Sequence, residues 1–138
     1  STDILTEDNL PTQQTKANVT YVPVQVVETE PEEQTIFEVV EQMPEFPGGN
    51  AALMQYLNKN IKYPVIAQEQ GVQGRVIVQF VVNKDGSIVD AQVVRSVDPY
   101  LDKEAIRVIN TMPKWTPGKQ RGKPVRVKFT VPVAFRLT

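Results

Sequence analysis

The chain has 138 residues, of which 41% are apolar, so it has material for one modest domain and a tail. It contains no cysteine and no histidine, which excludes thiolate catalysis, histidine general bases and zinc sites of the Cys/His kind. The net charge of −1 combines two unlike parts. Residues 1–47 carry ten Asp or Glu side chains against Lys16 alone, about −9, and the remainder is about +8.

Residues 1–34 are rich in Thr, Gln, Glu, Asn and Pro and show neither helical nor strand periodicity. This composition predicts a disordered acidic linker, because it offers too little apolar surface to offset the entropy of the chain. No run of residues is long enough to span a membrane, and the N-terminus lacks a signal-peptide pattern. Either the protein is soluble or, as the start at Ser1 without a Met favours, an N-terminal anchor lies in sequence that precedes it.

The folded domain is predicted to begin near Thr35. Residues 35–43 alternate apolar and polar side chains imperfectly, which favours a short strand leading into the domain. A stretch rich in Pro and Gly at 44–49 then breaks the chain. Asn50 is a suitable N-cap, and the apolar spacing that follows predicts a helix over 50–59.

A second short helix and a hairpin follow. Pro64 suits the first position of a helix, and Gly71 suits the position just past its end. Residues 74–82 alternate with period two and predict a strand. The turn residues at 83–86 and a second alternating run at 88–96 complete a β-hairpin.

The strongest helical pattern comes next. Asp98 precedes a proline and caps a helix predicted over 99–112, whose apolar residues recur at helical spacing. Trp115 lies in a Pro/Gly loop, and a lone tryptophan beside proline in a small domain predicts a core position rather than a ligand-facing one. We expect residues 120–123 to form a basic, mobile approach to the last strand.

The final run is the most informative element. Apolar residues occupy every odd position, which predicts a long strand with one buried face: Val125, Val127, Phe129, Val131, Val133, Phe135 and Leu137. Pro132 interrupts this strand, and a proline lacks the N–H that a central strand must donate. The strand is therefore predicted at a sheet edge, where an extended peptide could pair with it.

These elements together predict an α+β fold, with a three-stranded antiparallel sheet packed against two or three helices. The domain boundaries we expect are 1–34 for the linker and 35–138 for the folded domain. If the last strand pairs with the first strand of the hairpin, its other side faces solvent.

No constellation in the sequence supports catalysis or a cofactor. The stretch 118–124 has three residues between its glycines where a phosphate loop has four, and it has no Ser or Thr where a phosphate loop requires one. Asp85 precedes a glycine, but the spacing places a valine at the first ligand position of a calcium loop. Three carboxylates near the start of the long helix favour a helix-dipole role: Asp98, Asp102 and Glu104. We therefore predict no enzyme activity, no metal and no cofactor.

Many positions taken in order resemble the C-terminal domain of TonB-type energy transducers, and the likeness covers residues 36–138. The stretch 43–49 resembles the version common in Bacteroidetes-like bacteria. The positions that carry the resemblance are Tyr63-Pro64, Ala67, Gly71, Gly74, Val76, Val78, Phe80, Val82, Asp85-Gly86, Val93, Ser96, Ala105, Trp115, Pro117-Gly118, Val131, Val133 and Phe135.

This resemblance implies a periplasmic module carried by an inner-membrane anchor. The module would bind the TonB box, a short N-terminal segment of outer-membrane transporters, and pass on energy from an ExbB/ExbD-type motor during nutrient uptake. The residues that the resemblance and the edge-strand argument assign to peptide binding are Arg126, Val127, Lys128, Phe129, Thr130, Val131, Asn60 and Tyr63.

Other readings stay open at this stage. The same domain could serve a membrane signalling or peptidase protein. The basic second part could bind nucleic acid, although Phe129 and Phe135 share the apolar face and are unsuited to stacking on bases. An edge strand can also pair with a second copy, so we expect a monomer or a weak edge-paired dimer.

Overall fold

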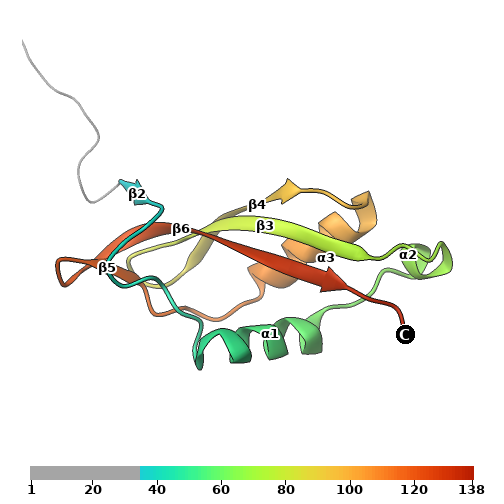
Figure 1. Ribbon diagram of the computed structural model, residues 1–138, viewed down its shortest axis with the longest axis horizontal. Coiled ribbons are helices and arrows are strands. Elements are labelled where there is room, and N and C mark those ends of the chain that lie inside the picture. Colours follow the sequence, from blue (N-terminus) through green and yellow to red (C-terminus); the bar gives the residue numbers. More distant parts are fainter. Residues whose placement is uncertain (1–34) are drawn as a thin grey trace, which may run out of the picture. The chain divides into compact units, whose positions relative to one another are not determined.

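The computed structural model describes residues 35–138, and the predicted linker over 1–34 lies outside them. Three long strands form the sheet: β3 (Gly74–Val82), β4 (Ile88–Arg95) and β6 (Lys123–Phe135). Three helices accompany it: α1 (Gly49–Asn60), α2 (Val65–Glu69) and α3 (Pro99–Asn110). Figure 1 shows α3 behind the sheet and α1 running alongside β6. The predicted α+β fold is confirmed.

Strand β3 is the central strand of the sheet. It pairs antiparallel with β4 on one side and with β6 on the other, in the strand order β2-β6-β3-β4. The β3–β6 register runs without interruption from Gly74 opposite Phe135 to Val82 opposite Val127. An unbroken register keeps the same side chains on the same face along the whole strand.

The core lies between the sheet and the helices. The odd-numbered side chains of β6 point into it, and Val127, Val131, Val133 and Phe135 are buried, as the period-two pattern predicts. The even-numbered side chains of β3 face them from the neighbouring strand. Trp115 is buried among the aromatic rings of Phe46, Phe80 and Phe129, so its predicted core position is confirmed.

The hairpin turn between β3 and β4 depends on Gly86. This residue has φ of 89°, and a side-chain Cβ there would come within 2.0 Å of the carbonyl oxygen of Trp115. The turn is closed by Asp85, whose carboxylate accepts hydrogen bonds from the backbone N–H and hydroxyl of Ser87. Glycine at this position therefore allows both the turn and the close packing of the Trp115 backbone.

The helix ends follow the predicted chemistry with two differences. Pro64, predicted at the first position of a helix, is instead the extended residue that precedes α2, which begins at Val65. The carboxylate of Asp98 accepts hydrogen bonds from the N–H groups of Tyr100 and Leu101, which caps α3 as predicted. Helix α1 begins one residue earlier than predicted. Gly48, with φ of 91°, precedes it in place of the predicted Asn50 cap. Within residues 35–138, no helix is long and apolar enough to cross a membrane.

Two short strands in the structure differ from what the sequence predicts. Strand β2 (Ile36–Phe37) is only two residues long and pairs parallel with β6 at Arg126 and Val127. Strand β5 (Gly118–Gln120) pairs antiparallel with the start of β6. The segment predicted as a mobile approach is instead a tight turn with φ of 55° at Arg121 and 76° at Gly122, the left-handed geometry of two-residue hairpins.

Candidate functional site

The outer edge of β6 is the most distinctive surface of the domain. Its inner edge pairs with β3 over residues 127–135. On the outer side, β2 covers residues 126–127, whereas β5 pairs with residues 123–125, before the β3–β6 ladder begins. Among the residues that the structure describes, no strand pairs with the outer side of residues 128–135. A stretch of backbone about eight residues long is therefore available for hydrogen bonding.

The direction of the free backbone groups follows from Pro132. In an antiparallel ladder, successive residues point their N–H and C=O groups to opposite sides. Pro132 has no N–H to donate to β3, which places the even-numbered residues on the outer side of the unbroken register. The outer edge then offers the N–H and C=O groups of Lys128, Thr130 and Ala134, and the C=O of Pro132.

The opposite edge of the sheet is less suited to receiving a strand. Strand β4 carries an extra residue at two places in its pairing with β3, and Asp90 has a positive φ of 56°. Such bulges twist an edge and interrupt its row of hydrogen-bonding groups, which protects it from strand addition. The straight edge of β6 has no such protection.

The predicted peptide-binding residues of β6 differ in their surroundings. The expectation of a bare edge is wrong at Arg126 and Val127, where β2 already pairs. Arg126 donates a hydrogen bond of 2.9 Å from Nε to Oδ1 of Asn83, and the Val127 side chain is buried. A two-residue parallel strand is too short to be recognised by periodicity, which explains the error.

The remaining residues of this segment lie on the uncovered part. Lys128 forms a loose, exposed ion pair with Glu38, with 3.9 Å between Nζ and Oε2. Thr130 is exposed. The side chains of Phe129 and Val131 face the core, where the ring of Phe129 lies 5.1 Å from that of Trp115. These two side chains pack in the core and hold the strand in place.

The two predicted residues outside β6 make structural contacts. The side-chain amide of Asn60 donates to the carbonyl of Tyr56 one turn earlier. The Tyr63 hydroxyl donates to the carbonyl of Val72, and its ring packs edge-on against Phe135 at 5.6 Å. Burial raises the pKa of Tyr63. Tyr63 supports the end of β6 and Asn60 bonds within the last turn of α1, and any contact of either with a bound peptide remains a prediction.

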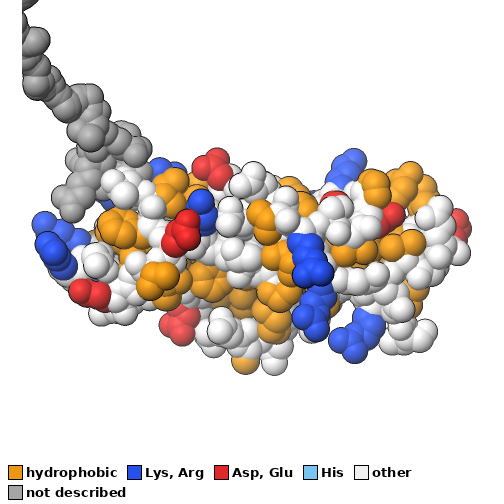
Figure 2. All heavy atoms as spheres, turned by 45° about the horizontal axis from the view of Figure 1, so that its top comes forward, with side chains coloured by type: hydrophobic (Ala, Val, Ile, Leu, Met, Phe, Trp, Pro, Cys, Tyr) orange, Lys and Arg blue, Asp and Glu red, His pale blue; other side chains and the backbone are white. Residues whose placement is uncertain are grey.

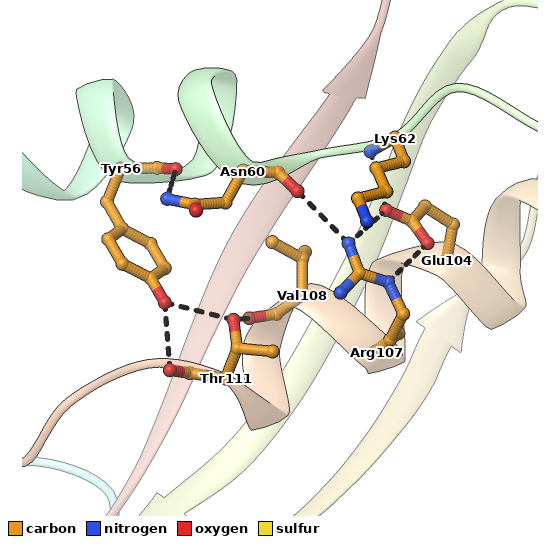
Figure 3. Close-up of polar contacts among 7 residues, drawn as sticks. All are labelled: Tyr56, Asn60, Lys62, Glu104, Arg107, Val108 and Thr111. Atoms are coloured by element: carbon orange, nitrogen blue, oxygen red, sulfur yellow. Dashed lines mark hydrogen bonds and ion pairs between the residues drawn. The ribbon is translucent and has the colours of Figure 1, made fainter.

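A polar network joins α1 to α3 and fixes the position of α1 (Figure 3). The Tyr56 hydroxyl donates to the carbonyl of Thr111, and Arg107 donates to the carbonyl of Asn60 at 3.0 Å. Arg107 also forms two hydrogen bonds of 2.7 Å with the carboxylate of Glu104. Two side-chain-to-backbone hydrogen bonds, between residues 47 and 55 positions apart in sequence, therefore hold the two helices together.

Glu104 is the one buried charged residue in the described part of the chain. Burial acts to raise its pKa, but hydrogen bonds from the Arg107 guanidinium and the Lys62 N–H outweigh that effect. The pKa of Glu104 therefore lies below its usual range. The proximity of Asp98, Asp102 and Glu104 in sequence does not make an acid/base pair, because Asp98 and Asp102 bond to nearby backbone N–H groups.

Basic side chains mark part of the surface. On the face shown in Figure 2, Lys and Arg side chains form separate groups, one at the left end and a larger one toward the right. The β5–β6 hairpin carries three of the basic residues, Lys119, Arg121 and Lys123. Over residues 35–138, no three acidic side chains are arranged to hold a metal ion.

Comparison with known proteins assigns the family. The family model for the Gram-negative bacterial TonB protein C-terminal domain matches residues 59–137. The chain belongs to the TonB C-terminal family. The described TonB C-terminal domain extends beyond that match at its N-terminal side, where α1 and β2 lie.

Curated relatives agree with this assignment. Protein TonB of Helicobacter pylori (strain ATCC 700392 / 26695) is 32% identical over 77 residues, which is 55% of this chain and 26% of that protein. Protein TonB of Pseudomonas aeruginosa PAO1 is 36% identical over 77 residues, 54% of this chain and 22% of that protein. The chain therefore spans about a quarter of the length of these relatives.

A solved structure has the same fold. The NMR solution structure of the Helicobacter pylori TonB-CTD superimposes with a TM-score of 0.50 at 28% sequence identity, covering 64% of this chain and 80% of that one. The sequence-based recognition of a TonB C-terminal domain is thus confirmed by sequence and by fold.

Proposed function

We propose that this domain is the periplasmic peptide-binding module of a TonB-type transducer. In this proposal it binds the TonB box of an outer-membrane transporter by adding that segment as a strand to β6. A motor of the ExbB/ExbD type, acting through an inner-membrane anchor in preceding sequence, would supply the energy. The family assignment supports the transducer role, and the outer edge of β6 supports the binding mode.

The observation that carries the proposal is the unpaired outer side of β6 at residues 128–135. The same edge already accepts a strand: β2 pairs with it, in parallel, at the two residues just before the uncovered part. An extended peptide placed in line with β2 would continue that ladder. The sheet therefore contains, within its own chain, a short example of the pairing that we propose for the partner.

The hydrogen bonds available at this edge suit a reversible grip. The free N–H and C=O groups of residues 128–135 can each form a bond worth about 0.5–1.5 kcal/mol net. Association costs about 4–15 kcal/mol of lost freedom, so a few such bonds give modest affinity unless side chains add to it. Lys128 and the basic turn beside β5 would attract a segment that carries acidic residues.

Strand addition also suits the transmission of force. A pull along the direction of β6 loads the hydrogen bonds of the added ladder together, in shear, rather than one after another. The inner side of β6 pairs with β3 along nine residues, which anchors the strand in the domain while its outer side is pulled. The β3–β6 ladder that anchors the strand is thus longer than the uncovered edge, residues 128–135, that would hold the partner.

A titration with synthetic peptides tests the proposal. The peptides are N-terminal segments of outer-membrane transporters from the source bacterium, and scrambled versions serve as controls. We expect the authentic peptides to shift the NMR signals of Lys128 to Phe135 and to leave those of β4 unchanged. Shifts confined to β4, or equal binding of scrambled peptides, would contradict strand addition at β6.

A further inference from the structure

A groove runs beside the uncovered edge of β6, and α1 forms its other wall. The hollow has a volume of about 230 Å³ and an open mouth. Figure 1 shows α1 alongside β6 over this part of the strand. The residues that line the groove are Met54, Leu57, Asn58 and Ile61 on the helix side and Arg75, Pro132 and Ala134 on the sheet side.

The walls of this groove are largely apolar. Met54 is 39% exposed although it is a large hydrophobic residue, and the buried Leu57 and half-buried Ile61 line the groove with it. Pro132 and Ala134 belong to the exposed, even-numbered set of β6 that borders the free backbone groups. Arg75, which sits opposite Ala134 in the β3–β6 register, completes the sheet side.

The size of the groove points to side chains rather than to a small molecule. Sites for drug-sized ligands measure about 300–1,000 Å³, which exceeds this hollow. An apolar side chain or two, reaching down from a segment bound above, matches its volume better. Because the side chains of a strand alternate between its two faces, only every second residue of such a segment could point into the groove.

The helix wall is held in a fixed position before any partner arrives. The hydrogen bonds between Tyr56 and Thr111, and between Arg107 and the carbonyl of Asn60, join α1 to α3 (Figure 3). A wall fixed in this way loses little freedom on binding, so apolar contacts with it add to affinity more fully. The residues of α1 before Lys59 also lie outside the region that the family model matches.

We propose that this groove is a specificity pocket for alternate apolar side chains of the segment bound at β6. The inference rests on the proposed strand addition. It goes beyond that proposal because it assigns sequence preference to α1, an element N-terminal to the matched region. The backbone edge of β6 bonds to any extended segment, whereas the groove favours segments with apolar residues at every second position on the helix side.

A pair of substitutions on α1 tests this assignment. Met54→Gln replaces the exposed apolar wall with a polar side chain of similar length. Gln55→Met is the matched control: it is the next residue on the same helix, it is exposed, and it does not line the groove. Both exchange Met and Gln, which have similar helix propensities, so both variants should keep the fold.

The probe is the transporter peptide that binds most tightly to the unaltered domain, together with a version whose alternate apolar residues are serine. We expect Met54→Gln to weaken binding of the parent peptide about 3- to 10-fold and to leave the serine version nearly unchanged. We expect Gln55→Met to bind both peptides as the unaltered domain does.

The outcomes separate the two proposals. If the parent peptide protects the β6 edge but Met54→Gln and Gln55→Met have equal effects, the groove is not a specificity pocket and strand addition stands. If Met54→Gln weakens binding of the parent peptide and of the serine peptide equally, the groove does not recognise the alternate apolar side chains. If no transporter peptide binds at β6, both proposals are wrong.

Discussion

Replacing Thr130 with proline should separate folding from binding. By the argument from Pro132, the N–H of Thr130 points away from β3, so it makes no hydrogen bond inside the sheet. Pro132, two residues further along, already occupies the equivalent position without breaking the register. Thr130→Pro should therefore keep the domain folded, with a loss in the free energy of unfolding of about 1 kcal/mol from the altered backbone preference.

The effect on binding follows from the number of donors. On the outer side of residues 128–135, N–H groups are offered by Lys128, Thr130 and Ala134, so the substitution removes one of three. A net hydrogen bond contributes about 0.5–1.5 kcal/mol, which corresponds to a loss in affinity of about 2- to 12-fold. Thr130→Val is the control, because it keeps the N–H and the branched shape and removes only the hydroxyl.

The assay pairs isothermal titration of a transporter peptide with urea unfolding of each variant. We expect Thr130→Val to bind like the unaltered domain and Thr130→Pro to bind more weakly while remaining folded. A loss of more than about 3 kcal/mol in stability would show that the N–H of Thr130 pairs with β3. Equal affinity of the two variants would show that the partner does not use this edge.

Three further predictions concern the stability of the domain. Trp115→Ala should lower the free energy of unfolding by about 3–5 kcal/mol, because the ring is buried against three aromatic residues; a stable variant that has lost peptide binding would contradict the core assignment. Glu104→Gln should cost about 1–3 kcal/mol at pH 7, measured by urea unfolding. The folded-state pKa of Glu104 is lowered, so the stability that its carboxylate contributes is present above the ordinary glutamate pKa of about 4.3 and is lost as the pH falls through the folded-state pKa. Glu104→Gln should therefore lose less stability on acidification than the unaltered domain does, and an unchanged pH profile would contradict this role of Glu104. The exposed Glu69→Gln is the control. Removing residues 1–34 should leave the melting temperature within a few degrees, and a large drop would show that this segment contributes to the fold.

The sequence predicts the parts of the fold that depend on local pattern. The odd-numbered apolar residues of β6 set its buried face, and Pro132 indicates which strand lies near an edge and which of its N–H groups point outward. Asp98 predicts the start of α3 through its capping chemistry. Each of these features depends on one residue or on a regular spacing along a single element, so it can be predicted from the sequence alone.

The sequence could not predict the features that depend on distant segments meeting. Strand β2 is two residues long, and its pairing with Arg126 is made across ninety positions of sequence. The groove is assembled from α1, β3 and β6, and its helix wall is fixed by Arg107 contacting Asn60. No periodicity marks Met54 as a pocket residue, because its exposure depends on how α1 packs beside the sheet.

Amide hydrogen exchange along β6, followed by NMR, tests the central claim most directly. Without peptide, the amides of Lys128 and Thr130 should exchange fast and those of Phe129 and Val131 slowly, because only the second pair bonds to β3. A bound transporter peptide should slow the exchange of Lys128 and Thr130 and leave that of β4 unchanged. The reverse pattern, or equal protection of both pairs in a peptide-free monomer, would contradict an open outer edge and the strand addition proposed for it.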